Sequence, residues 1–150
     1  MKFTLVVALL SAFAFPVFAD SVLVVQNANY SNPNTSLSTV TCSRLAQHYP
    51  HFSSLPSFPN IGGMPGAVLS SSLCGSCWSL KPAPPCRDPL PFYFTVVNDI
   101  SGRFVDAAND VNTTVYDISL QAYGNLTHAS CNVDAVYAEA TQVHASLCGM

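Results

Sequence analysis

The stretch CGSCW, residues 74–78, places Cys74 and Cys77 three positions apart and supports four interpretations that exclude one another. It matches the local pattern around the nucleophile of papain-like cysteine proteases. Its C-x-x-C spacing also suits a redox pair or half of a zinc site. In the fourth interpretation the two cysteines belong to two different structural disulfides. The rest of the sequence has to decide among these four interpretations. The choice also decides the class of fold.

The N-terminus indicates export from the cell. Lys2 precedes an almost uninterrupted apolar run over residues 3–15, and Val17 and Ala19 stand at the two positions that signal peptidase inspects. A run of this length with these flanks is typical of a secretory signal peptide and is too short for a membrane span. We therefore expect residues 1–19 to be a signal peptide. Residues 20–150 should form one secreted, extracellular domain that associates with the cell wall.

The mature chain is poor in charge and acidic overall. Removing Lys2 from the five basic residues leaves four against eight acidic ones, a formal net charge of −4. This balance excludes the basic footprint of a nucleic-acid-binding protein and the polybasic cluster that holds anionic membrane. A neutral surface rich in Ser, Thr, Asn and Pro suits neutral ligands such as polysaccharide, and equally suits any small extracellular β-domain. No cofactor or metal is expected.

The cysteines favour the structural interpretation of CGSCW. All six lie in the mature region, at Cys42, Cys74, Cys77, Cys86, Cys131 and Cys148. An even count in an exported chain predicts three disulfides, but the spacing leaves their connectivity open. A papain-like protease needs its His and Asn roughly 130–150 residues beyond the Cys, whereas only the 73 residues 78–150 follow Cys77. No thioredoxin-like βαβ pattern and no second C-x-x-C supports the redox or zinc interpretation.

The chain is built of short apolar runs between turn signals. Strands are expected over residues 21–26, 67–69, 77–80, 92–97 and 133–143, the last as one strand or two, with a weak alternation over 115–123. Residues 48–66 and 81–91 are rich in Pro or Gly and should be irregular, while short helices are expected from Thr35 or Ser36 and over 105–111. Many short strands predict a mainly β fold, a small barrel or sandwich. Sequons at Asn29, Asn34, Asn112 and Asn125 predict glycosylated surface loops.

Four runs carry a resemblance to a known family. NPNTSLSTV (residues 32–40), SLPSFPNIGG (54–63), CGSCWSL (74–80) and TQVHASLCG (141–149) together resemble the cerato-platanin family of secreted fungal proteins. The resemblance implies a six-stranded double-ψ β-barrel with short helices, similar to the first domain of expansins. It also implies two disulfides, Cys42–Cys74 and Cys77–Cys148. Cys86 and Cys131 have no family counterpart, so these two should form a third bridge.

The resemblance also implies a function. Cerato-platanins are non-catalytic, bind chitin (N-acetylglucosamine) oligomers, loosen cellulose in the manner of expansins, elicit plant defence and self-assemble at interfaces. We therefore expect a monomeric, non-catalytic protein that binds chitin or another cell-wall polysaccharide, with plant surface receptors as further partners. The alternative is a surface-active, self-assembling coat protein without sugar binding. A glycoside hydrolase would need two carboxyl groups around the scissile bond, and the acidic residues form no recognisable pair.

The expected site lies after the central strand. The family has a functionally important Asp there, and this chain reads VVNDISGRF over residues 96–104. A gapless placement puts Asn98 at that position, and a turn shorter by one residue puts Asp99 there. Tyr30, Asn32 and Asn34 lie in a family-like loop and could bind sugar through amide groups and an aromatic face. Trp78, beside two cross-linked cysteines, is expected to pack in the core.

Overall fold

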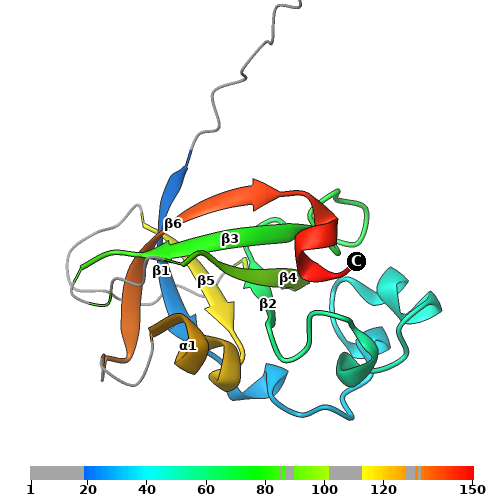
Figure 1. Ribbon diagram of the computed structural model, residues 1–150. Coiled ribbons are helices and arrows are strands. Elements are labelled where there is room, and N and C mark those ends of the chain that lie inside the picture. Colours follow the sequence, from blue (N-terminus) through cyan, green and yellow to red (C-terminus); the bar gives the residue numbers. More distant parts are fainter. Residues whose placement is uncertain (1–18, 85, 87–89, 102–112, 128–130, 132) are drawn as a thin grey trace, which may run out of the picture.

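The computed structural model describes residues 19–84, 86, 90–101, 113–127, 131 and 133–150, which include six strands and one α-helix. The strands are β1 (Asp20–Gln26), β2 (Ile61–Met64), β3 (Cys77–Pro82), β4 (Phe92–Asp99), β5 (Thr114–Ile118) and β6 (Ala135–Val143). They close into a barrel in the order β1-β5-β2-β4-β3-β6 (Figure 1). The predicted fold class, a mainly β six-stranded barrel tied by disulfides, is confirmed.

The strand order mixes parallel and antiparallel pairs. β1 lies parallel to β5 and β2 parallel to β4, while the other four neighbouring pairs are antiparallel. Parallel neighbours cannot be joined by a tight hairpin, so the chain must cross over the barrel to form them. Closure leaves the barrel without an unpaired edge, which removes the usual template for aggregation.

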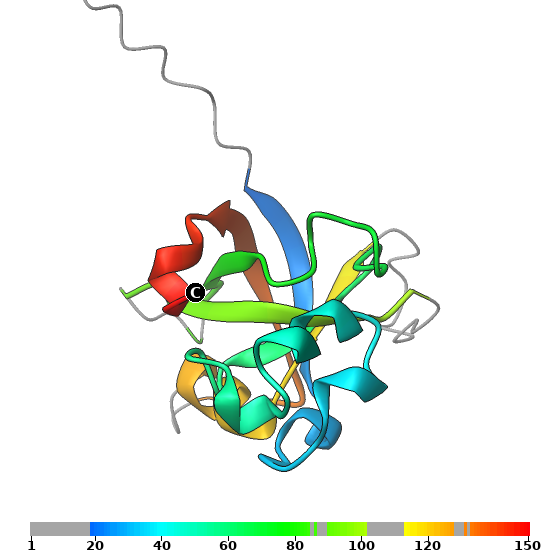
Figure 2. The ribbon, with the colours of Figure 1, turned by 90° about the vertical axis from the view of Figure 1, so that its right-hand side faces the viewer.

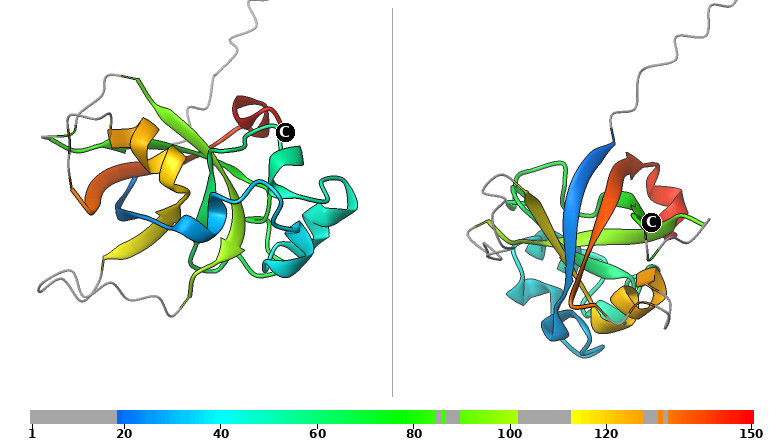
Figure 3. Two further views of the ribbon diagram at one scale, coloured as in Figure 1. Left: turned by 90° about the horizontal axis from the view of Figure 1, so that it is seen from below. Right: turned by 90° about the vertical axis from the view of Figure 1, so that its left-hand side faces the viewer.

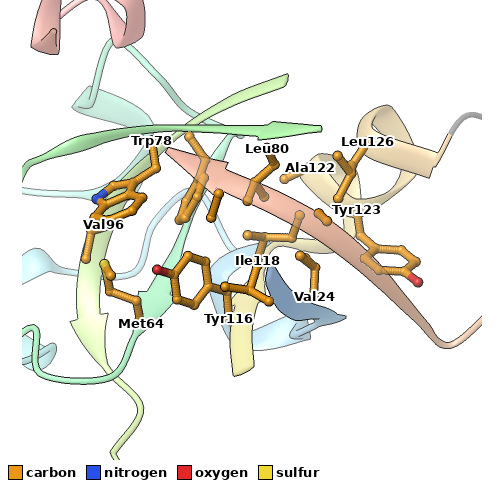
Figure 4. Close-up of a cluster of buried hydrophobic side chains, with 14 of the residues drawn as sticks. Val24, Met64, Trp78, Leu80, Val96, Tyr116, Ile118, Ala122, Tyr123 and Leu126 are labelled. Atoms are coloured by element: carbon orange, nitrogen blue, oxygen red, sulfur yellow. The ribbon is translucent and has the colours of Figure 1, made fainter. Parts of the chain in front are cut away.

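The barrel interior is filled by one aliphatic and aromatic core (Figure 4). The ring of Tyr116 contacts Trp78 edge-on, with 5.9 Å between centroids, and lies 6.2 Å from Phe94. Trp78 is only 8% exposed, and its indole Nε1 donates to Ser76 Oγ at 2.9 Å. Burial with a satisfied polar handle is the usual state of a core tryptophan. The expectation that Trp78 packs in the core is confirmed.

A second apolar layer covers the outer face of β2 and β4. The segment between β1 and β2 folds into four 3₁₀ turns, η1 (Ala28–Tyr30), η2 (Leu37–Thr39), η3 (Ser43–Gln47) and η4 (Phe52–Ser54). Figure 2 shows these turns gathered against one side of the barrel. Leu37 and Phe52 from the turns pack with Ile61 of β2 and Val97 of β4. Ser36 caps η2 through its hydroxyl, so the predicted helix start is confirmed, although the helix is a single 3₁₀ turn.

Three predicted elements differ from the structure. Residues 67–69 form a turn rather than a strand, because Val68 N donates locally to Gly66 O and Ser71 N to Val68 O. β2 lies inside the stretch that was expected to be irregular. The weak alternation over 115–123 is β5 followed by α1 (Leu120–Thr127), where Ser119 Oγ accepts from Ala122 N at 3.0 Å and ends the strand pattern. The helix predicted over 105–111 lies outside the described residues.

The glycine pair explains why β2 was missed. Gly62 and Gly63 suggest a turn, but here they allow close packing inside a sheet. A Cβ on Gly63 would lie 2.7 Å from both the Tyr30 hydroxyl and Asp117 Oδ1, and one on Gly62 would overlap the Asp117 carbonyl. Any other residue at these positions would push the neighbouring strand or the covering layer away.

All three disulfides are formed as expected. Cys42 bonds Cys74, Cys77 bonds Cys148, and Cys86 bonds Cys131, with Cα–Cα distances of 5.2, 5.8 and 5.5 Å. The two cysteines of CGSCW therefore connect one short segment to the layer before it and to the C-terminus. Within the described part of the chain, no helix is long and apolar enough to cross a membrane.

Candidate functional site

A β-bulge at the end of β4 positions the candidate site. Gly62 pairs with Val96 and Gly63 with Asn98, so the register between β2 and β4 skips Val97. A bulge re-aims the side chains that follow it. Val97 is buried in the outer apolar layer, and the Asn98 side chain is turned toward the same layer, where it meets Thr41 and Tyr30.

Asn98 is held by three hydrogen bonds. Its Oδ1 accepts from Thr41 N at 2.9 Å and from Thr41 Oγ1 at 2.8 Å, and its Nδ2 donates to the Tyr30 hydroxyl at 3.1 Å. The adjacent Cys42 N donates to Val97 O, which fixes the Thr41 segment against β4. A primary amide has two N–H donors, so within the part of the chain that the structure describes, one N–H of the half-buried Asn98 has no acceptor.

Tyr30 acts through its hydroxyl and not through its ring. The residue is 2% exposed, and its ring packs against Phe52 with centroids 6.2 Å apart. An aromatic face buried in this way is not available for stacking on a sugar. Tyr30 therefore stays in the candidate site as the partner that orients Asn98.

A buried carboxylate lies close to the Tyr30 hydroxyl. Asp117 of β5 is 1% exposed and accepts from Asn27 Nδ2 at 2.6 Å and from Gly63 N at 3.1 Å. Charge-assisted bonds of this kind offset the cost of burying a carboxylate. The cluster ties Asn27, which caps the η1 turn that carries Tyr30, to β2 and β5.

Asp99 has a different set of partners. Its Oδ1 accepts from Ser101 Oγ at 2.6 Å, from Gly66 N at 2.9 Å and from Ser101 N at 3.0 Å. The Ser101 hydroxyl, with the Ser101 and Gly66 N–H groups, lowers the pKa of Asp99 below its usual 3.8 despite some opposing desolvation. Asp99 is therefore ionised at neutral pH, which suits an acceptor of hydrogen bonds and not a proton donor.

The remaining predicted site residues lie further along the loop. Asn32 and Asn34 are both exposed, and Asn32 Oδ1 accepts from Asn34 N at 3.1 Å in a local turn. The loop is anchored by Ser31 Oγ, which accepts from Leu120 N. The structure thus brings Tyr30 to Asn98 directly, and places the two asparagines in the exposed continuation of the same loop.

Thr41, Gly63 and Asp117 were not predicted as site residues. Thr41 bonds Asn98 across 57 positions and Asp117 bonds Gly63 across 54. The only signal in the sequence was the Gly62-Gly63 pair next to an apolar run. Among the described residues, no group of three or more His, Cys, Asp or Glu side chains could hold a metal ion.

Two hollows are present elsewhere on the described surface. One of about 490 Å³ lies between Phe58, Asn60, Phe92, Tyr93 and Leu147, at the start of β4. The other, of about 360 Å³, lies over β3 and β6. Asn98 and Asp99 line neither of these two hollows, and they lie at the opposite end of β4 from the first one.

These features define a class of protein: a small β-barrel, tied by disulfides, with hydrogen-bonding side chains at the end of its central strand. The cerato-platanin family model matches residues 22–84. The allergen Asp f 15 of Aspergillus fumigatus is 28% identical over 96% of this chain and 97% of its own length. Cerato-platanin 1 of M. perniciosa has 28% identity and a TM-score of 0.70, over 85% of this chain and 98% of that one. The fungal elicitor cerato-platanin has 25% identity and a TM-score of 0.66, over 85% and 96%.

The chain is similar to cerato-platanins in both sequence and fold. This family consists of secreted fungal proteins that are generally non-catalytic and include a known elicitor. The resemblance drawn from the four sequence runs is confirmed.

Proposed function

We propose that the protein is a secreted, non-catalytic, expansin-like binder of chitin-type oligosaccharides, with Asn98 and Asp99 as its central contacts. The observation that carries the proposal is that a hydrogen-bond donor, the Asn98 amide, and an acceptor, the Asp99 carboxylate, are adjacent at the end of β4. Among the described residues, one amide N–H of Asn98 has no acceptor, and the three bonds described for Asp99 all go to its Oδ1. A donor beside an ionised acceptor suits the hydroxyl and N-acetyl groups of such a sugar.

The neighbouring loop extends this surface. The exposed amides of Asn32 and Asn34 follow Tyr30 directly, so a chain of several sugar units would meet further donors and acceptors after leaving Asn98. The elicitor role is proposed from the likeness to the fungal elicitor cerato-platanin, with a plant surface receptor as the partner.

The state of Asp99 supports the non-catalytic part of the proposal. Glycoside hydrolysis needs a carboxylic acid that is still protonated at the working pH. The Ser101 hydroxyl and N–H shift the pKa of Asp99 the opposite way. A group that stays ionised can bind a sugar hydroxyl but cannot protonate the leaving oxygen.

Calorimetric titration with the N-acetylglucosamine tetramer tests the proposal. Asn98→Ala should weaken binding by about five- to tenfold, the equivalent of one lost hydrogen bond. Gln121→Ala, which removes an exposed amide on α1, is the matched control and should bind as the unmodified protein does. Equal affinities for Asn98→Ala and the control would remove Asn98 from the site. Release of reducing sugar during the titration would refute the non-catalytic assignment.

The second candidate function is surface activity. Val68 and Leu69 are adjacent in the turn after Gly66 and are 45% and 47% exposed. Two neighbouring apolar side chains on one tip favour adsorption at an air–water interface. If this is the main function, the double variant Val68→Ser/Leu69→Ser loses its effect on surface tension while sugar affinity is unchanged.

A further inference from the structure

The hollow over β3 and β6 lies on the side of the barrel away from the candidate site. In the ring of strands, β6 and β1 stand across from β2 and β4. The right panel of Figure 3 shows β1 and β6 side by side on this face. The hollow measures about 360 Å³ with Ala19 as one of its lining residues; Ala19 belongs to the expected signal peptide, and the mature chain contributes Ser21, Lys81, Pro84, Tyr137 and Glu139 among others.

An exposed aromatic ring forms part of this hollow. Along β6, Val136, Ala138 and Ala140 are buried, so the alternation of the strand turns Tyr137 and Glu139 outward. Tyr137 is 44% exposed, in contrast to Tyr30, Tyr116 and Tyr123, which are all buried. Its ring is therefore available to a ligand.

Two side chains of opposite charge line the same hollow as the ring. Lys81 of β3 lies directly opposite Glu139 of β6 in the antiparallel register, a position from which Lys and Glu side chains often pair. Within the described part of the chain, however, neither the ammonium, the carboxylate nor the Tyr137 hydroxyl has a hydrogen bond or an ion pair. Three polar groups thus line one hollow without a protein partner among the described residues.

We propose that this hollow is a second carbohydrate-binding site that takes a neutral pyranose ring. The apolar C–H face of the sugar lies on the Tyr137 ring, one hydroxyl donates to Glu139, and a neighbouring oxygen accepts from Lys81. Lys81 and Glu139 cancel in charge, so the hollow does not select an anionic or a cationic ligand. An aromatic surface with a few converging polar groups is the usual composition of a small-ligand site.

A second site on the opposite side of the barrel changes what one molecule can do. With sugar contacts at Asn98 and at Tyr137, a single monomer can hold two polysaccharide chains. The inference shares the ligand class with the proposed function but uses none of its residues, so each can fail without the other.

Amide chemical shifts during titration with the N-acetylglucosamine tetramer and with cellotetraose test this site. The amides of Lys81, Tyr137 and Glu139 should shift with a binding curve of their own, separate from that of Thr41 and Asn98. Tyr137→Ala should weaken the binding that the Lys81 and Glu139 amides report by about tenfold, the equivalent of one lost ring contact. Tyr137→Phe keeps the ring and should keep most of the binding. Gln142→Ala, on the same strand but outside the hollow, should change nothing.

The outcomes separate the two proposals. Shifts at Thr41 and Asn98 without shifts at Lys81, Tyr137 and Glu139 for either sugar overturn the second site alone. Shifts at Lys81 and Glu139 that keep the same binding curve in Tyr137→Ala also overturn the second site. Shifts confined to the Tyr137 group support the second site and contradict the proposed function. Absence of shifts in both groups contradicts both.

Discussion

Asn98 donates a hydrogen bond from its amide nitrogen to the hydroxyl of Tyr30, over 3.1 Å. The bond joins the end of β4 to the layer of 3₁₀ turns, 68 positions earlier in the chain. Because Tyr30 is buried and Thr41 donates twice to the Asn98 oxygen, the Asn98 side chain is held in one orientation. The structure thus orients the Asn98 amide at the end of β4, next to the Asp99 carboxylate, which has partners of its own.

Removing the Asn98 side chain should destabilise the protein. Asn98→Ala leaves the buried Tyr30 hydroxyl and the Thr41 donors without this partner, a change that costs about 1–3 kcal/mol of unfolding free energy. Denaturant unfolding measures it, with Asn34→Ala in the exposed loop as a control expected within about 0.5 kcal/mol of the unmodified protein. Equal stability of the two variants would mean that the Asn98–Tyr30 bond has no structural role.

Two glycines should respond to the same substitution with opposite signs. Gly63→Ala brings a Cβ to within 2.7 Å of Tyr30 and Asp117 and to 2.6 Å of Ile100, and should destabilise by at least about 1–3 kcal/mol through overpacking. A Cβ on Gly124, inside α1, meets no atom within 4 Å, so Gly124→Ala should stabilise by about 0.5–1 kcal/mol through helix propensity. Melting temperatures of the pair check both signs, and a stabilising Gly63→Ala would contradict the packing around β2.

The third disulfide should contribute stability without determining the fold. Cys86 and Cys131 are 45 positions apart in the chain, and removing both as Cys86→Ala/Cys131→Ala should lower the unfolding free energy by about 2–4 kcal/mol. The amide spectrum should retain the dispersion of a folded barrel. An unchanged unfolding midpoint under non-reducing conditions would show that the bridge does not constrain the unfolded chain as expected.

The pKa of Asp99 sets the sign of a pH effect. Its folded-state pKa is lowered, first by the Ser101 hydroxyl and then by the Ser101 N–H, so its stabilising contribution is present above the unfolded pKa and is lost as pH falls through the folded value. The carboxyl ¹³C shift of Asp99 should therefore titrate with a midpoint below 3.8. Ser101→Ala should move that midpoint upward. A midpoint that does not respond to Ser101→Ala would remove Ser101 as the cause.

Short apolar runs in the sequence were enough to predict β1 and β4. β1 and β4 are apolar runs bounded by polar residues, and both lie close to their expected positions. The disulfides followed from the family resemblance, with Cys86 and Cys131 left to pair. β2 was missed because Gly62 and Gly63 have no local strand preference. Their place in the sheet depends on Tyr30 and Asp117, which approach only in the folded chain.

The site was predictable only in part, for a similar reason. The turn after β4 could be located, but the choice between Asn98 and Asp99 depends on the bulge at Val97, and the bulge depends on pairing with β2. In the folded chain Asn98 bonds Thr41 and Tyr30. Asp99 bonds Ser101 and Gly66. Contacts of this range leave no periodicity or spacing in the sequence that would reveal them.

The central claim, that the end of β4 binds a chitin-type sugar, is tested most directly by an amide shift map with the N-acetylglucosamine tetramer. We expect concentration-dependent shifts at Thr41, Gly66, Asn98 and Ser101 in the unmodified protein, and much smaller shifts at these positions in Asn98→Ala. A saturating titration that leaves these four amides unmoved would contradict the claim.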